Sequence, residues 1–231
     1  MSRSTAVLRV LGLLPCALLV AVAAMAAPAP IYRAKPFTLW VTGWNRPVDA
    51  LGDCRFDKED DKLTITVPGA GHGFPGQVER LSAPHLLRDV EGDFSVEVRV
   101  GGRFEHKNPQ NGQLRRGAGL LLSDGDKLVR FGRVVDENNV MVLGVFCPPM
   151  SGSTGDPSTV QNPTYLRIER RNNVLTLKHS TDRQKWTNPF EGHPAWNVPF
   201  AKKIQVGVFA ESMAPGSFAP AFDQFVLTPS K

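Results

Sequence analysis

Two short strand-like segments around an Asn-Asn pair constrain this fold more than any other feature of the sequence. Residues 165–170 and 174–179 read YLRIER and VLTLKH, and Asn172-Asn173 lies between them. Asn tolerates the positive φ that both central residues of a type I′ turn require, so the pair predicts a tight antiparallel hairpin. This pairing places Ile168 opposite Leu177. It puts four apolar side chains on one face of the hairpin: Leu166, Ile168, Leu175 and Leu177. A one-residue shift would mix the two faces, so the register is well specified.

The rest of the chain also reads as short strands. Apolar and polar residues alternate at residues 63–67 and 94–100, and apolar residues at every second position of 204–210 mark another strand. Residues 222–227 are expected to form the last strand. Three segments are more continuously apolar and predict central strands covered on both faces or lining a cleft: residues 117–122, 127–135 and 140–146. A first strand is expected at 37–42, and the Pro-rich residues 147–163 are expected to form a long irregular loop. No segment keeps a 3.6-residue period, so we predict an all-β sandwich of two antiparallel sheets over residues 37–231.

The turn after the hairpin contains a side-chain pattern that is typical of backbone capping. Residues 180–186 read STDRQKW. Ser and Asp side chains commonly accept hydrogen bonds from backbone N–H groups one to three residues further along a turn. We therefore expect Ser180 and Asp182 to bond the turn backbone while Trp186 packs inward.

The N-terminal segment has the layout of a secretory signal peptide. Arg3 and Arg9 precede an apolar run at residues 10–24, which ends in the small-residue stretch AAMAAPAP. The run is shorter than the roughly 20 residues that span a bilayer. We predict a signal peptide at residues 1–26, an extended leader at 27–36, and no membrane-spanning segment after processing. The expected location is exported: periplasmic, at the cell surface or extracellular.

The net charge and the cysteine content bear on three further features: nucleic-acid binding, disulfide bonding and metal binding. The formal net charge of +5 falls to +3 when the signal removes its two arginines, and no basic patch indicates nucleic acid. Cys16 leaves with the signal, so Cys54 and Cys147 remain, an even number that permits one disulfide in an exported protein. Two buried free thiols are the alternative, and both stay open. No Cys/His cluster indicates zinc, and no metal or cofactor is predicted from the residues.

Several segments resemble a known class of sandwich: residues 52–69 (GDCRFDKEDDKLTITVPG), 83–100 (APHLLRDVEGDFSVEVRV), 117–133 (GAGLLLSDGDKLVRFGR), 165–186, and VGVFAES followed by FDQFVL. The chain resembles the concanavalin A-like lectin/glucanase sandwiches, and within them the uncharacterised bacterial proteins related to fungal regulator-of-enolase-like proteins. It is also similar to the accessory sandwich domain of β-xylosidases. The resemblance implies a jelly-roll fold and, as in many relatives, glycan contact on a concave face. It also implies that Asp223 could ligate a structural calcium.

One carboxylate trio invites comparison with the glucanases of this class. Glu91, Asp93 and Glu97 approach the Glu-x-Asp-x-(x)-Glu pattern whose outer two carboxylates do the chemistry. The last spacing here is longer than that pattern allows, and Glu91 and Asp93 read as turn residues. We therefore predict no catalytic residue.

Sugar binding asks for an aromatic face beside planar polar groups. Trp44 and Trp196 lie in expected loops, and Arg130 and Arg133 lie on strands of the expected cleft sheet, so these four are the candidate ligand-binding residues. The alternative for both Trp residues is a cover over the ends of the core. The favoured function is an exported, non-catalytic protein that binds a carbohydrate or another extracytoplasmic polymer. A glycan-cleaving enzyme and a structural envelope protein are the alternatives.

Overall fold

The structure is a computed structural model that describes residues 47–73, 81–105, 115–135, 140–147, 150–154, 163–191 and 196–230. All of them belong to one unit, Ala34–Lys231. The expected signal peptide, leader, first strand and Trp44 lie outside the described residues. Within the described ranges the regular structure is entirely β, and no helix there is long and apolar enough to cross a membrane.

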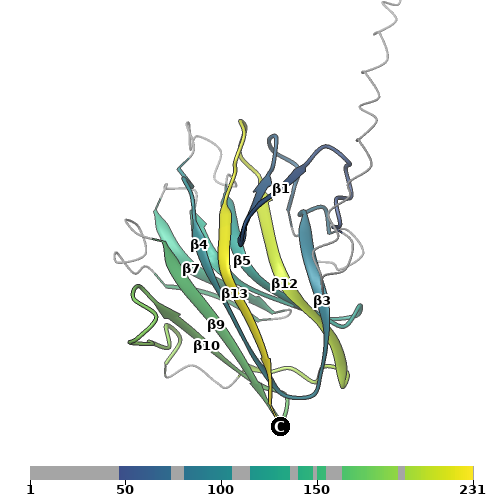
Figure 1. Ribbon diagram of the computed structural model, residues 1–231, viewed down its shortest axis with the longest axis vertical. Helices are drawn as coiled ribbons and strands as arrows, with labels where there is room; N and C mark the ends of the chain where they lie inside the picture. Colours follow the sequence, from purple (N-terminus) through teal and green to yellow (C-terminus); the bar gives the residue numbers. More distant parts are fainter. Residues whose placement is uncertain are drawn as a thin grey trace, which may run out of the picture. The chain divides into compact units, whose positions relative to one another are not determined.

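Two antiparallel sheets make up the fold, as the all-β prediction requires (Figure 1). The seven-stranded sheet contains, in spatial order, β1 (Arg55–Glu59), β2 (Lys62–Thr66), β13 (Ala221–Pro229), β4 (Phe94–Gly101), β9 (Thr164–Arg171), β10 (Val174–Ser180) and β11 (Trp196–Asn197). The six-stranded sheet contains, in spatial order, β3 (His85–Glu91), β12 (Lys203–Ser212), β5 (Arg116–Ser123), β6 (Leu128–Val135), β7 (Met141–Cys147) and β8 (Met150–Thr154).

The core lies between the facing surfaces of the two sheets. Strand β4 shows why these residues form strands, because its positions alternate between buried and half-buried along all eight residues. Val96 and Val98 from this strand pack in the same apolar cluster as Leu120 and Phe131 from the other sheet, and all four are 0% exposed. Full burial of each such side chain contributes roughly 1.5 to 3 kcal/mol.

The β9–β10 hairpin forms as the sequence predicts. Asn172 and Asn173 both have positive φ, at 48° and 65°, as a type I′ turn requires. Ile168 pairs with Leu177, and the two strands alternate between buried and half-buried positions. Arg170 is the exception on the core side. Its buried guanidinium donates hydrogen bonds to the carbonyl oxygens of Phe200 and Ala201 at 3.3 and 3.0 Å.

Two local expectations are wrong, and one strand of the structure has no counterpart among the expected elements. The expected loop at 147–163 contains β8, which pairs with β7 as the outermost strand of its sheet. The segment that became β3 was not predicted, because its first three residues are all buried and do not alternate. Ser180 and Asp182 accept hydrogen bonds from the turn backbone, as expected. Trp186, however, does not pack in the core: the Arg167 guanidinium lies over the Trp186 ring, 3.8 Å from the ring centroid.

Gly207 in β12 offers a sensitive test of this packing, because it lies between Leu87 of β3 and Leu121 of β5. A Cβ atom there would collide with the Leu86 carbonyl oxygen and lie 2.8 Å from the Leu87 Cα. Gly207→Ala should therefore lower the free energy of unfolding by about 1 to 3 kcal/mol. Gly152→Ala is the matched control, since its nearest neighbour would be the Phe190 ring at 3.4 Å. Equal urea midpoints for the two variants would contradict this packing.

Candidate functional site: an amphipathic pocket beside the β13 bulge

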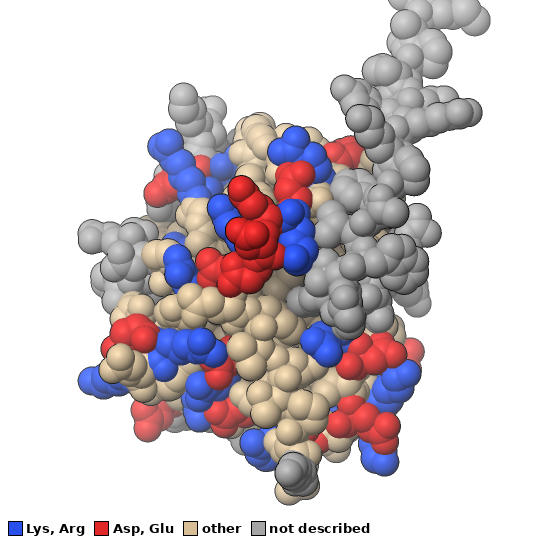
Figure 2. Space-filling model, viewed as in Figure 1, with Lys and Arg blue, Asp and Glu red and all other residues tan. Residues whose placement is uncertain are grey.

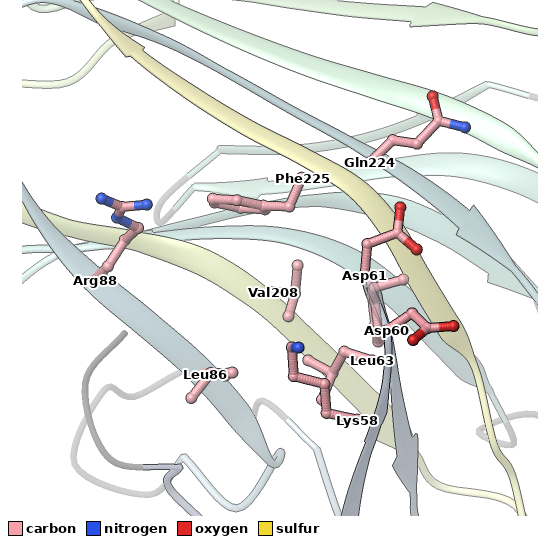
Figure 3. A pocket seen from close by; sticks show the side chains of 10 residues that line it. Lys58, Asp60, Asp61, Leu63, Leu86, Arg88, Val208, Gln224 and Phe225 are labelled. Carbon is pink, nitrogen blue, oxygen red and sulfur yellow. The ribbon is translucent and has the colours of Figure 1, made fainter. Parts of the chain in front are cut away.

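A pocket of about 410 Å³ lies where the β1–β2 hairpin and β13 face β3 and β12 (Figure 3). Its apolar lining comes from both sheets: Leu63, Leu86, Val208, Phe222 and Phe225. Its polar side chains are those of Lys58, Asp60, Asp61 and Arg88, and Gln224 borders the pocket at the β13 bulge. The volume falls in the range of roughly 300 to 1,000 Å³ that small-molecule sites occupy.

A β-bulge in β13 shapes one wall of this pocket. Asp223 pairs with Arg99 and Val226 with Glu97, so β13 carries one extra residue between these two pairs. Gln224, inside the bulge, has a φ of 51°, in the left-handed region. In a regular strand Phe222 and Phe225, three residues apart, would lie on opposite faces. The extra residue lets both side chains pack against the core cluster.

The amide of Gln224 turns to the opposite side of β13. The Tyr165 hydroxyl and the Arg183 guanidinium each donate to Gln224 Oε1 at 3.4 Å. In Figure 3 the Phe225 side chain extends over Val208 while the Gln224 side chain points away from it. The bulge therefore aims an aromatic ring into the pocket.

Arg88 supplies a buried hydrogen-bond donor beside the pocket. It lies between Leu86 and Val90 on β3, an outermost strand of the six-stranded sheet. Its Nε atom is buried and makes no hydrogen bond to the protein. Buried donors almost always have partners, and leaving one unpaired costs about 1 to 3 kcal/mol. A ligand oxygen in the pocket would be a suitable acceptor.

Two carboxylates stand on the other side of the apolar lining from Arg88 (Figure 3). Asp60 and Asp61 form the tight turn between β1 and β2, where Glu59 pairs with Lys62. Asp60 has a φ of 52°, which Asp tolerates better than most residues. Both side chains are exposed. Figure 2 shows acidic groups gathered over this part of the molecule with basic groups beside them.

The structure places the two candidate arginines on opposite faces of β6. Arg130 lies on the outer face of its sheet, where it pairs with Glu211 and stacks 5.2 Å from the Phe146 ring centroid. Arg133 points into the core, donates to the Val100 carbonyl oxygen at 3.0 Å, and is buried enough that desolvation lowers its pKa to about 10. Neither side chain lines the pocket.

Two other predicted ligand residues have structural partners. Trp196 lies in β11 at the edge of its sheet, edge-on to Phe190 with ring centroids 5.7 Å apart, as the core-cover alternative expects. Asp223, the calcium candidate, faces Arg99 with an N–O distance of 3.5 Å. Neither contributes to the pocket lining.

Cys54 and Cys147 are both buried free thiols in this structure. Of the two alternatives that the sequence leaves open for Cys54 and Cys147, the structure therefore contains the unbridged one.

The carboxylate trio is divided between the two sheets. Glu91, at the end of β3, accepts a hydrogen bond from Lys202 with an N–O distance of 2.6 Å, and this contact lowers the pKa of Glu91. Asp93 accepts the Asn172 backbone N–H at 3.0 Å. Glu97, on β4, lies between Arg167 and Arg183 with N–O distances of 2.8 and 3.1 Å. These three side chains each serve a separate polar contact.

The residues that do line the pocket were not singled out from the sequence. Arg88, Asp60, Asp61 and Phe225 come from three parts of the chain that only the sheet topology brings together. One usable signal was present in FDQFVL, since Phe222, Phe225 and Leu227 cannot share a face without one extra residue.

Fold and pocket together define a two-sheet antiparallel β-sandwich protein with a small-molecule-sized pocket between the sheets. The chain belongs to a family described as "Protein of unknown function (DUF1349)", whose model matches residues 55–230. No curated protein matches the chain.

Solved structures with the same fold include proteins from three organisms. A functionally unknown protein from Saccharomyces cerevisiae is 18% identical with a TM-score of 0.64, over 81% of this chain and 96% of that one. A xylan β-1,4-xylosidase from Bacillus halodurans C-125 is 12% identical with a TM-score of 0.53, over 75% of this chain and 38% of the enzyme. An alginate lyase from Klebsiella pneumoniae is 10% identical with a TM-score of 0.53, over 76% and 84%. At these identities the likeness shows the fold alone.

Proposed function

We propose that the protein binds a carbohydrate in the pocket beside the β13 bulge and does not cleave it. The observation that carries this proposal is the pocket's mixed lining, an apolar surface with an aromatic ring between polar groups at its ends. A sugar ring presents apolar C–H faces and a rim of hydroxyl groups, so it suits both parts of such a lining. Arg88 Nε, buried without a hydrogen bond, would donate to a sugar hydroxyl or carboxylate oxygen.

The compared folds support the same class of ligand. Two of the similarly folded proteins are by name a xylosidase and an alginate lyase, both of which act on polysaccharides. We further infer a concanavalin A-like jelly roll related to the regulator-of-enolase-like proteins. Signal-peptide removal near residue 26 would export the protein to the periplasm, the cell surface or the medium, where glycan polymers are available.

Cleavage is the alternative, and the pocket's carboxylates favour binding. A glycosidase needs two carboxyl groups on either side of the scissile bond, about 5 to 10 Å apart. The carboxylates among the described lining residues are Asp60 and Asp61, neighbours in one tight turn on one side of the pocket. A sugar held there would meet both from the same direction.

A glycan array on the mature protein, followed by calorimetric titration of the tightest oligosaccharide, tests the binding. Losing a hydrogen bond to a charged group costs roughly 1.5 to 3 kcal/mol, so Arg88→Gln should weaken binding by about tenfold or more. Arg99→Gln is the matched control, because Arg99 is also a strand arginine but faces Asp223 outside the pocket. Equal affinities for the two variants, or no glycan bound at all, would refute the proposed site.

An assay for newly released reducing ends, run on the same glycans, separates binding from cleavage. We expect no release by the wild type. Release that disappears in Asp61→Asn but persists in Glu97→Gln would show that the pocket is an active site. Glu97 serves as the control because Arg167 and Arg183 engage it on the outer face.

A further inference from the structure

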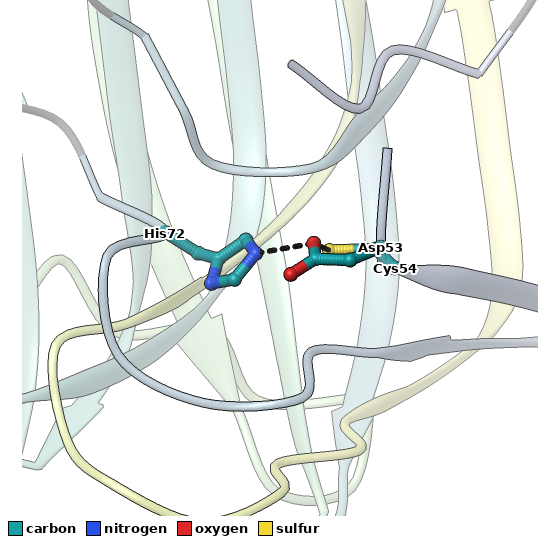
Figure 4. A group of neighbouring side chains, drawn as sticks. All are labelled: Asp53, Cys54 and His72. Carbon is teal, nitrogen blue, oxygen red and sulfur yellow. Dashed lines mark hydrogen bonds and ion pairs between the residues drawn. The ribbon is translucent and has the colours of Figure 1, made fainter. Parts of the chain in front are cut away.

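A second group of polar side chains gathers at the start of β1, made of residues that the pocket does not use. Asp53 and Cys54 immediately precede β1, and His72 follows the second strand of that hairpin. One oxygen, the sulfur and one ring nitrogen of these residues all lie within 4.8 Å of one another (Figure 4). Oxygen, sulfur and imidazole nitrogen are the donor atoms that zinc takes in proteins.

His72 is held in the orientation that metal-bound histidines adopt. Its side chain is 2% exposed, and its backbone exchanges hydrogen bonds with Ser212 at the end of β12, at 3.1 and 2.7 Å. Nδ1 lies 3.0 Å from the Gly69 carbonyl oxygen, which can only accept, so Nδ1 carries the proton of this bond. Metal-ligating histidines usually donate one ring N–H to a carbonyl and keep the other nitrogen for the ion. Here that other nitrogen, Nε2, lies 2.8 Å from Asp53 Oδ1.

Cys54 is surrounded by carboxylate groups. Its sulfur lies 3.7 Å from Asp53 Oδ1, and its backbone N–H donates to Asp49 Oδ2 at 2.8 Å. The second Asp49 oxygen, Oδ1, is buried and accepts no hydrogen bond. Two carboxylates beside a buried sulfur leave negative charge that a divalent cation would neutralise.

We propose that Asp53, Cys54 and His72 bind one Zn²⁺ ion. Tetrahedral zinc with bonds of about 2.0 to 2.3 Å sets its ligand atoms roughly 3.3 to 3.7 Å apart, so the sulfur and Oδ1 already stand at a suitable distance. Oδ1 and Nε2 would separate by about half an ångström. On binding, the zinc replaces the thiol proton of Cys54 and the proton between His72 and Asp53, and both leave to solvent without any oxidation or reduction. Three protein ligands leave a fourth position for water or for Asp49.

A zinc ion there would join the start of β1 to the loop that holds His72 against β12. The ion would therefore tie an outermost strand of the seven-stranded sheet to the opposite sheet, and it should raise the thermal unfolding midpoint of the protein. Because this effect requires no glycan, the zinc site and the proposed sugar site can fail independently.

The mature protein, stripped with a chelator, is to be titrated with Co²⁺ and then Zn²⁺. We expect a near-ultraviolet thiolate-to-cobalt charge-transfer band that saturates at one ion per chain and disappears when zinc displaces cobalt. Zinc should also raise the unfolding midpoint. Cys54→Ser should remove the band, and Asp53→Asn should weaken zinc binding by at least about tenfold. Asp53 has a side chain 47% exposed, so this variant is expected to fold.

Two matched controls are available in the same chain. Cys147→Ser removes the other buried thiol, and His85→Gln alters another buried histidine, which contacts the Ala83 carbonyl oxygen. Both should keep the charge-transfer band and the zinc affinity. Folded wild-type protein without the band would overturn the site, as would a band of unchanged intensity in Cys54→Ser.

Discussion

Ile168→Asp is expected to leave the protein without a cooperative unfolding transition. Ile168 is 0% exposed and lies in the middle of the seven-stranded sheet, paired with Val96 on β4 and Leu177 on β10. A carboxylate placed there would be surrounded by apolar side chains, and an unpaired buried charge costs several kcal/mol or forces protonation. Domains of this kind have a total stability of roughly 5 to 15 kcal/mol, so the loss is comparable to the whole.

Two companion variants serve as controls. One separates the effect of the buried charge from the effect of altered packing, and the other compares the inner with the outer face of the hairpin. Ile168→Val removes a single methylene and should cost about 0.5 to 1.5 kcal/mol. Lys178→Ser acts on the outer face, where the ammonium group meets Glu169 at 2.9 Å, and should cost less than about 1 kcal/mol. Guanidinium denaturation followed by circular dichroism measures all three. Similar midpoints for Ile168→Asp and Lys178→Ser would mean that the two faces of the hairpin are equally buried.

The hairpin was predictable because everything that fixes it is local. The turn needs two residues with positive φ, the sequence offers two adjacent asparagines, and the apolar face follows from the register. Arg167 shows where local reasoning stops. The alternation places it on the outer face, but its stacking on Trp186 and its ion pair with Glu97 depend on the next turn and on a distant strand.

The candidate sites depended on relations that sequence spacing does not encode. Arg130 and Arg133 are three residues apart and so lie on opposite faces of one strand, but a continuously apolar strand does not show which face meets the core. Arg88 became a pocket residue because β3 lies opposite β13 and β2. Likewise Cys54 and His72 approach each other across the β1–β2 hairpin, without any sequence pattern of metal ligands.

The largest polar effect is expected from Glu211, which lies on the outer face of the six-stranded sheet. Its side chain is 0% exposed, and one oxygen pairs with Arg130 Nη1. The other oxygen accepts no hydrogen bond and lies 3.7 Å from Arg115 Nε. Burial lowers the pKa of Arg130, and the charge of Glu211 opposes that shift. The carboxylate therefore compensates part of the cost of burying the guanidinium.

Glu211→Ala should lower the free energy of unfolding by about 3 to 5 kcal/mol, because it leaves the buried Arg130 without this carboxylate. The space is tight, since a Cβ on Gly117 opposite would come within 2.6 Å of Glu211 Oε1, so a truncation also leaves a gap. Glu211→Gln keeps the shape of the side chain and removes its charge. If electrostatics dominates, this variant should lose most of the unfolding free energy that Glu211→Ala loses.

Replacing both partners by apolar residues of similar size completes the test. Buried ion pairs replaced in this way are often neutral or stabilising, so Glu211→Leu combined with Arg130→Met should be markedly more stable than the sum of the two single changes predicts. Urea unfolding of the wild type, the two single variants and the double variant gives the coupling energy between Glu211 and Arg130 directly. Strictly additive losses would mean that Glu211 and Arg130 contribute independently, and that the pair is held in place by the fold around it.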